Sequence, residues 1–472
     1  MSGSFRTLET AGDFGGDIPA QDALARVRPA VRSREGADSK RYLVFHYVLV
    51  AYLFMYVSRL PELVPWLRIG YLLMPILLVG LVMTDQAKVL LDVRTGRWLA
   101  AFTIWVAVCV PVSFWPGGSF RTLVGTAQSL LIVAFIVAFV RSMRDVMRAA
   151  IAIGLASGTI AILSFISSAN IANRQGLGGS ASLADPNFFA LYLLVGTAML
   201  CIVASQTSGW LRPCAIVLIP INLAAMARSG SRAGIAALAA GVVLFLIYAS
   251  AKQRVVVLSA CLAGALCGAF LLPQDITQRF TDWFAPGGFR VLTTGRTTPS
   301  SEATGELTTA ESSSEARMYL LRRSLIMTAK HPIFGVGPDQ FQGAEAADAS
   351  ENGVRGAWHF THNTYTQISS EMGIPGLLLF CAALFGSYRG LSAISRRGPT
   401  RYTRQTALFL QVGYFMLMLG AFFLSLGYGG LPFIMIGVVE AFKRSVARQI
   451  RESNVPRIRP EFSPAVQFSR VS

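Results

Sequence analysis

The sequence predicts an all-α, polytopic membrane protein of about twelve transmembrane helices, with one large loop that contains short helices. The 472 residues have a mean hydropathy of +0.51, and only 14% are charged, whereas soluble domains carry about 25% charged residues. Long apolar runs also follow one another closely. The formal net charge of +17 is spread over short loops and the two tails, which argues against a nucleic-acid partner.

A membrane-spanning helix needs about 20 mostly apolar residues. Twelve segments approach this length: 42–58, 63–83, 98–115, 120–140, 146–167, 187–205, 210–226, 231–249, 255–272, 373–388, 405–426 and 428–442. The polar first 41 residues lack the apolar run of a cleavable signal peptide, so we expect the first span to act as the targeting signal. The six cysteines lie in apolar stretches without a CxxC pair and indicate core residues rather than disulfides or metal ligands.

The distribution of Lys and Arg predicts the orientation, because short cytoplasmic loops are enriched in them. With a cytoplasmic N-terminus, the inner short loops hold fourteen cations and the outer ones five. The chain then divides into a cytoplasmic tail 1–41, nine spans in 42–272, an outer loop 273–362, three spans in 363–442 and a basic cytoplasmic tail 443–472.

The outer loop 273–362 contains eight basic and ten acidic residues. Its segment Thr293–Ser314 is rich in Thr, Ser, Glu and Gly, a composition typical of disorder. From Ala316 to Lys330 an amphipathic helix is predicted, because apolar residues recur at helical spacing opposite Arg322 and Arg323; this predicted buried face consists of Met318, Leu321, Leu325 and Thr328. The step His331-Pro332 should end the helix.

Two arginines lie in the predicted outer turn 227–234, where Arg is otherwise scarce. Arg228 and Arg232 could extend to the lipid headgroups, while Ser231 caps the following helix. Alternatively, they form an anion site, since guanidinium groups bind phosphate oxygens in pairs. Arg174, in the turn 173–176, is a weaker candidate of the same kind.

Two of the four histidines, His359 and His362, lie where the outer loop enters the next span. Nearby carboxylates are sparse and no third ligand follows at a recognisable spacing, so we expect no metal. An imidazole on a polar face is a natural general base near neutral pH. If 361–371 is one helix, His362 shares a face with Tyr365 and Ser369, while Glu371 points away and is a structural residue.

No GxxxxGK[ST], HExxH, GxSxG or Asp-x-Asp motif is present, which gives no support to the enzyme chemistries that these motifs carry. The glycine-containing segments 335–338 and 373–376 are predicted to be turns.

The order and spacing of several short motifs resemble the O-antigen ligase–polymerase family of bacterial inner-membrane glycan transferases. They are Asp185-Pro186-Asn187, Ser231-Arg232-Ala233-Gly234, Arg317 followed by His331-Pro332-Ile333-Phe334-Gly335-Val336-Gly337-Pro338, and His362-Asn363 followed by Glu371-Met372-Gly373-Ile374-Pro375-Gly376. The resemblance covers about 180–440, and the N-terminal third matches only as membrane spans.

The resemblance implies transfer of a glycan from an undecaprenyl-diphosphate carrier to an acceptor at the periplasmic face of the inner membrane, without a metal or other cofactor. His362 matches the general base, and Arg232 and Arg317 match the arginines that hold the diphosphate. Arg228 has no clear counterpart. Supporting roles are open for Arg174, Asn187, His359 and Asn363.

Ligase and polymerase both remain open, so the acceptor is either a saccharide chain or the lipid A core. Besides these lipid-linked partners, the protein would contact only membrane lipids.

Two alternative functions belong to other classes of protein. A transporter of a small anion should carry charges near the bilayer midplane, and the spans are nearly free of them. A scaffold subunit of an envelope assembly would leave the outer Arg and His residues without a purpose.

Overall fold

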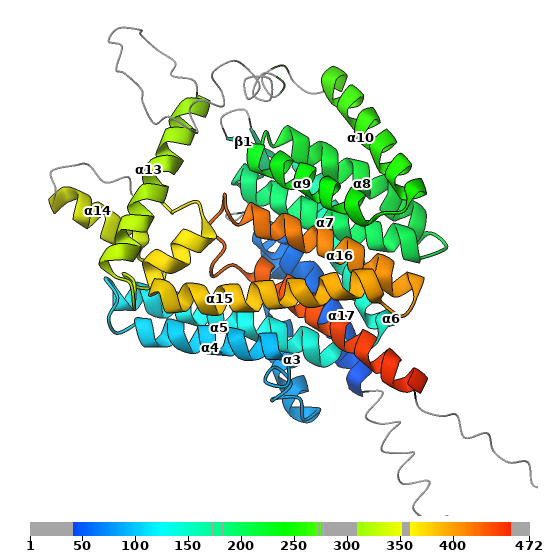
Figure 1. Ribbon diagram of the computed structural model, residues 1–472, viewed down its shortest axis with the longest axis horizontal. Coiled ribbons are helices and arrows are strands. Elements are labelled where there is room, and N and C mark those ends of the chain that lie inside the picture. The colour runs from blue at the N-terminus through cyan, green and yellow to red at the C-terminus, as the bar shows by residue number, and fades with distance from the viewer. Residues whose placement is uncertain are drawn as a thin grey trace, which may run out of the picture.

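The computed structural model describes residues 41–171, 174–178, 180, 183–271, 274, 277, 309–351 and 359–454. These residues form a bundle of long helices, with α13 and α14 standing at one end of it (Figure 1). Both predicted tails and most of the predicted disordered segment lie outside the described residues. The last six residues of that segment, 309–314, belong to helix α13, so the prediction of disorder is wrong for them.

Each of the twelve predicted spans overlaps a helix. The first half of the chain forms the helix Arg41–Ser58, α2 Leu60–Leu63, the 3₁₀ helix η1 Pro65–Leu72, α3 Leu73–Met83, α4 Arg94–Cys109, α5 Pro116–Phe139, α6 Met143–Ile166 and α7 Pro186–Gln206. The second half forms α8 Leu211–Arg228, α9 Arg232–Tyr248, α10 Ala251–Leu271, α13 Thr309–Lys330, α14 Phe341–Glu351, α15 Thr364–Arg397, α16 Arg401–Gly420 and α17 Gly430–Asn454.

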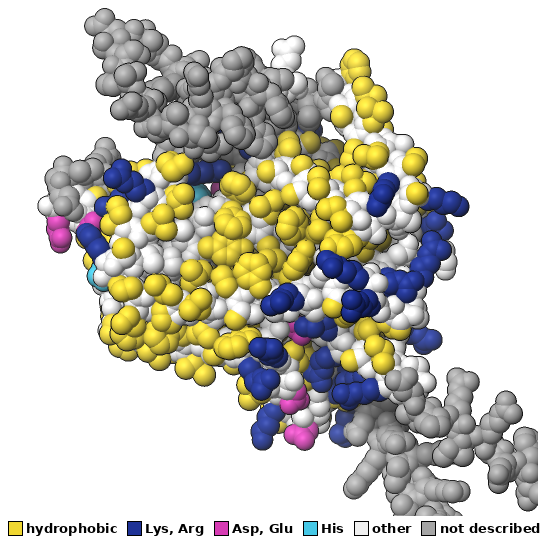
Figure 2. All heavy atoms as spheres, in the orientation of Figure 1, with side chains coloured by type: hydrophobic (Ala, Val, Ile, Leu, Met, Phe, Trp, Pro, Cys, Tyr) yellow, Lys and Arg dark blue, Asp and Glu magenta, His cyan; other side chains and the backbone are white. Residues whose placement is uncertain are grey.

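Within the described part, seven helices are long and apolar enough to cross a membrane, and α9 is a shorter apolar helix. Apolar side chains cover the middle of the bundle, while Lys and Arg gather near the end where α15 ends and α16 begins (Figure 2). The predicted class, an all-α polytopic membrane bundle, is confirmed.

One element departs from the all-α prediction. Strand β1 Ser168–Ile171 pairs antiparallel with β2 Arg174–Leu177, in a register that sets Ile171 opposite Arg174. This short hairpin follows α6 directly and precedes α7. The predicted turn at 173–176 is therefore largely strand.

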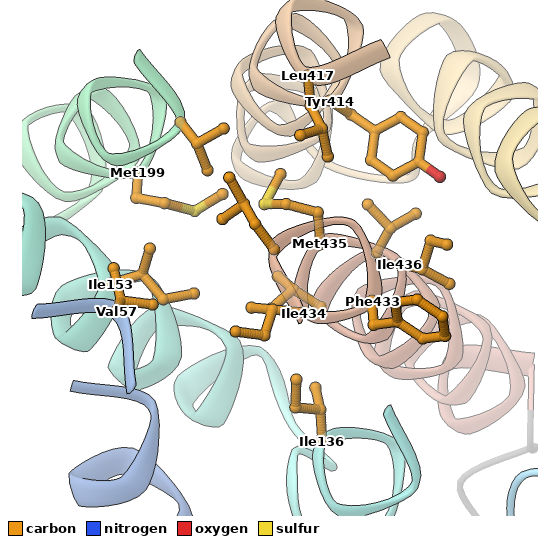
Figure 3. Packing of buried hydrophobic residues seen from close by; sticks show 14 of the residues in the cluster. Val57, Ile136, Ile153, Met199, Tyr414, Leu417, Phe433, Ile434, Met435 and Ile436 are labelled. Atoms are coloured by element: carbon orange, nitrogen blue, oxygen red, sulfur yellow. The ribbon is translucent and has the colours of Figure 1, made fainter. Parts of the chain in front are cut away.

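The core lies where α5, α6, α7, α16 and α17 meet (Figure 3). Side chains of α17 such as Phe433, Ile434 and Met435 are fully buried there, in the same cluster as Met199 of α7 and Tyr414 of α16 (Figure 3). Packing of this kind fixes the helices rigidly, because even one missing methylene in a close-packed interior is felt. The ends of α7 and α16 are thus firm supports for the loops that follow.

The predicted amphipathic helix within the long loop is confirmed as α13, but its predicted buried face is wrong. Met318 and Leu325 are about half exposed, at 45% and 53%, whereas Leu320, Ser324 and Met327 are buried. Leu320 and Met327 cluster with Val336, Phe341 and Ala344. The hydroxyl groups of Thr328 on α13 and Ser369 on α15 are hydrogen-bonded at 2.8 Å.

Candidate functional site

The N-termini of α7 and α9 are fastened together by a short chain of hydrogen bonds. Asp185 caps α7, since its Oδ1 accepts from the backbone N–H groups of Asn187 at 2.7 Å and Phe188 at 3.2 Å. Ser231 caps α9 by accepting from Gly234 N at 3.1 Å, and its hydroxyl donates to Asn187 Oδ1 at 2.8 Å. Asn187 therefore has a positioning role, and Arg232 is held at the first residue of α9.

Arg317 of α13 approaches this pair of helix ends. Burial lowers the pKa of Arg317, the positive charge of Arg232 lowers it further, and Asp185 raises it. Within the described residues neither arginine forms an ion pair, and Arg232 Nε is buried without a hydrogen-bond partner. Because guanidinium groups stay charged at neutral pH, Arg317 and Arg232 are two cations near enough to repel each other, and Asp185 is a carboxylate near enough to Arg317 to attract it. This arrangement suits an anionic ligand.

The C-terminal end of α13 is fixed by the loop 331–340, which lies against the kink of α15. Val336 N donates to Ser370 O, and Gly337 N donates to Glu371 O, both at 2.9 Å; Ile374 N donates to Pro332 O at 2.8 Å. These backbone contacts set the position of α13, and therefore of Arg317, relative to α15.

Two glycines make this contact possible. Gly335 has φ +66°, and a Cβ there would lie 2.2 Å from the carbonyl carbon of Glu371. Gly373, at the kink of α15, has φ +69°, and its Cβ would lie 2.1 Å from Ile333 O. Only glycine adopts such angles at no steric cost. The sequence prediction of two separate turns missed that the two glycine motifs are the two sides of one contact.

His362 lies just before α15 rather than on it. Helix α15 begins at Thr364, with Asn363 as its cap: Asn363 Oδ1 accepts from Tyr365 N at 3.0 Å and Thr366 N at 3.2 Å. The prediction that His362 shares a helix face with Tyr365 and Ser369 is therefore wrong. His362 itself has a φ of +50°, a conformation that costs a non-glycine residue free energy and often marks functional sites.

The backbone N–H of His362 donates to Ser425 Oγ at 3.1 Å, whereas its imidazole makes no hydrogen bond to any described residue. Burial lowers the pKa of His362, the positive charges of Arg317 and His359 lower it further, and Asp185 raises it. The imidazole is therefore neutral at pH 7 and able to accept a proton. Its electrostatic neighbours place His362 in the same cluster as Arg317 and Asp185, with the exposed His359 at the edge.

A cavity of about 280 Å³ opens beside His362. Phe188 of α7, Gln367 of α15 and Tyr428 of the loop before α17 contribute to its walls. Asp339 lines it too, and burial raises the pKa of this carboxyl group. His362 is one of the residues that line this cavity.

Glu371 supports the cavity wall without touching His362. Its carboxylate is buried and accepts hydrogen bonds from Tyr428 Oη at 2.7 Å, Asp339 N at 3.1 Å and Phe341 N at 3.4 Å. These hydrogen bonds agree with the interpretation of Glu371 as a structural residue, although not with the helix face on which that interpretation was based. The side chain that Glu371 holds is Tyr428, which the sequence prediction missed.

Two other arginines that the sequence analysis proposed as site residues are Arg228 and Arg174. Arg228, the last residue of α8, is exposed, and its Cζ lies 5.3 Å from the centre of the Phe165 ring; its charge is not among those that shift the pKa of Arg317 or His362. Arg174 begins strand β2, and its side chain lies outside the described part. Among described residues, no group of three or more His, Cys, Asp or Glu could hold a metal ion.

A family model described as O-antigen ligase matches residues 215–381. This range runs from α8 into α15 and contains Arg232, Arg317 and His362, whereas Asp185 and Asn187 lie outside it. The match supports the resemblance of this part of the chain to the O-antigen ligase–polymerase family.

Among solved structures, the chain is similar to one from "Structural coordination of polymerization and crosslinking by a peptidoglycan synthase complex". The two share 14% sequence identity with a TM-score of 0.42, over 75% of this chain and 97% of that chain. No curated protein matches.

Proposed function

We propose that the protein is a metal-independent glycosyltransferase that transfers or polymerises an undecaprenyl-diphosphate-linked oligosaccharide onto an acceptor sugar hydroxyl at the periplasmic face of the inner membrane. The observation that carries the proposal is His362 in the wall of a cavity of about 280 Å³, coupled electrostatically to Arg317, which is in turn coupled to Arg232.

In the proposed reaction, the acceptor oxygen attacks the anomeric carbon of the donor glycan and the bond from that carbon to the diphosphate oxygen breaks. His362 takes the proton of the acceptor hydroxyl. Arg232 and Arg317 stabilise the negative charge that grows on the departing lipid diphosphate. Because this diphosphate is already a good leaving group, one base and two cations suffice. Attack from the side opposite the leaving group inverts the anomeric centre.

The orientation in the membrane belongs to the same proposal. The split of fourteen to five cations between the short loops favours cytoplasmic termini. This orientation supports a periplasmic site. Reporter fusions after Arg254 and after Glu315 should report cytoplasm and periplasm, respectively. The same compartment at both positions contradicts the proposed location of the site.

The direct test is transfer by the purified full-length protein, with an undecaprenyl-diphosphate-linked oligosaccharide as donor. Two acceptors are compared: a second lipid-linked repeat unit and a lipid A core. Longer lipid-linked chains identify a polymerase, and glycosylated lipid A core identifies a ligase. If a lipid-linked donor that binds the protein is transferred to neither acceptor, the proposal fails.

A further inference from the structure

A second and larger cavity, of about 630 Å³, lies next to the one that contains His362. Its walls come from the helix Arg41–Ser58, from α2, α3 and α5, and from the loop before α17. The two cavities share Gly125 of α5 and the pair Tyr428-Gly429. Tyr428, held by Glu371, is therefore a common wall between His362 and this larger space.

The walls of the larger cavity combine aromatic rings with planar polar groups. Three tyrosines contribute (Tyr52, Tyr56 and Tyr428), together with Gln128, Ser129 and the charged pair Arg59 and Glu62. Sugars present C–H faces that stack on aromatic rings and hydroxyl groups that bond to amides, carboxylates and guanidinium groups. A volume of 630 Å³ is typical of a pocket for a small organic ligand.

Among the described residues, Arg59, the arginine of this cavity, is paired with a carboxylate, unlike Arg232 and Arg317. Arg59 Nη1 donates to Glu62 Oε1 at 3.2 Å, Arg59 Nη2 donates to Tyr192 Oη at 2.9 Å, and its Cζ lies 4.8 Å from the centre of the Tyr56 ring. Its charge is neutralised by Glu62 within the cavity. An environment of this kind favours neutral hydroxyl-bearing groups over a diphosphate, which would compete with Glu62 for Arg59.

We propose that this second cavity binds the acceptor saccharide and presents its hydroxyl group, past Tyr428, to His362. The inference rests on the proposed glycosyltransferase function and adds the path of the second substrate. Arg232 and Arg317 line neither cavity, so the donor diphosphate and the acceptor sugar approach His362 from different sides. Gln128 then contributes to acceptor specificity.

Gln128 offers a test that leaves the donor cluster untouched. It is exposed on α5 and makes no hydrogen bond to any described residue, so a larger side chain there fills the cavity without breaking a contact. Gln128→Trp should raise the acceptor KM by roughly tenfold or more, with unchanged binding of the lipid-linked donor. Val124→Trp is the matched control, because Val124 lies one turn earlier on α5, is 43% exposed and lines neither cavity.

Acceptor binding can also be measured without turnover, by titrating the free acceptor saccharide into His362→Ala protein in a calorimeter. Adding Gln128→Trp to this variant should abolish the heat of binding, and adding Val124→Trp should preserve it. If Gln128→Trp does not fold, Gln128→Ala, which removes the amide, should weaken acceptor binding instead. An unchanged acceptor affinity in the folded Gln128 variant, or a loss of donor affinity, overturns the inference. Absence of transfer by the unmodified protein contradicts the proposed function itself.

Discussion

Arginine occurs at two places near the candidate site, and its partners differ sharply between them. Arg59 has a carboxylate, a phenol hydroxyl and an aromatic face around it. Arg232 and Arg317 have each other and one carboxylate, Asp185, which already caps α7. Arg59 thus has a carboxylate within hydrogen-bond distance, whereas Arg232 and Arg317 have none among the described residues; a buried Nε without a partner is common to Arg59 and Arg232.

The difference teaches how to separate structural cations from ligand-binding ones. A partly buried charge without a partner costs folding free energy, and a second like charge beside it adds repulsion. Natural proteins keep such unfavourable arrangements mainly where function needs them. The comparison therefore makes opposite predictions for the two places: substitutions of Arg232 or Arg317 should impair donor binding, and substitutions of Arg59 should impair stability.

The largest expected effect concerns the residue between the two regions. His362→Ala should lower the transfer rate by roughly 10²–10⁴-fold, the range that a positioned general base contributes. Donor binding should persist, because the imidazole acts on the acceptor hydroxyl rather than on the diphosphate. The rate of single-turnover transfer and the donor affinity, measured on the same purified protein, check this. A full rate in His362→Ala removes the catalytic role.

The next effect concerns how the diphosphate is held. Arg232→Lys and Arg317→Lys keep the positive charge but lose the paired hydrogen bonds of the guanidinium group, so each should weaken donor affinity by roughly 10–100-fold, the equivalent of about 1.5–3 kcal/mol for a charged hydrogen bond. Arg228→Lys is the control, since Arg228 contacts Phe165 and is exposed. Equal donor affinity in all three variants contradicts the assignment of Arg232 and Arg317.

The third comparison is between the stabilities of two variants, Arg59→Gln and Arg232→Gln, measured without substrate. Arg59→Gln removes two hydrogen bonds and leaves Glu62 without its cation, so the free energy of unfolding should fall by about 1–3 kcal/mol. Arg232→Gln removes one of two neighbouring like charges and should leave the melting temperature unchanged or raise it. Thermal unfolding in the same detergent measures both. A larger loss in Arg232→Gln than in Arg59→Gln contradicts the division between structural and ligand-binding arginines.

The helices were predictable because a bilayer demands long apolar runs, and all twelve predicted segments overlap helices. The resemblance also singled out Arg232, Arg317 and His362, which the structure brings into one electrostatic cluster. The sequence analysis missed two features that depend on contacts between segments far apart in the chain. The buried face of α13 contacts α14 and α15, and the glycines at 335 and 373 meet across nearly forty residues.

The start of α15 shows the limit of periodicity most clearly. Helical spacing grouped His362 with Tyr365 and Ser369, but the side chain of Asn363 caps the helix and leaves His362 outside it. The signal was present in the sequence, since Asn is a favoured cap residue. The larger cavity could not be predicted, because its walls come from five separate segments whose contacts only the fold determines.

The smallest effect is a shift in the pH dependence of transfer. Because burial and the charges of Arg317 and His359 lower the pKa of His362, its imidazole stays neutral below the usual pKa near 6.5. With saturating donor and acceptor, the rate should hold steady as pH falls through 6.5 and decline only at more acidic pH, where the imidazole becomes protonated.

Two substitutions should move this acidic decline in opposite directions. His359→Gln removes a cation that lowers the pKa of His362, so the decline should shift to higher pH. Asp185→Asn removes the anion that raises this pKa, while Asn remains a good helix cap, so the decline should shift to lower pH. The pH profile of single-turnover transfer measures both. Shifts in the same direction, or none in either variant, would show that the group titrating in the profile is not His362, and the general base would have to be sought elsewhere in the cluster.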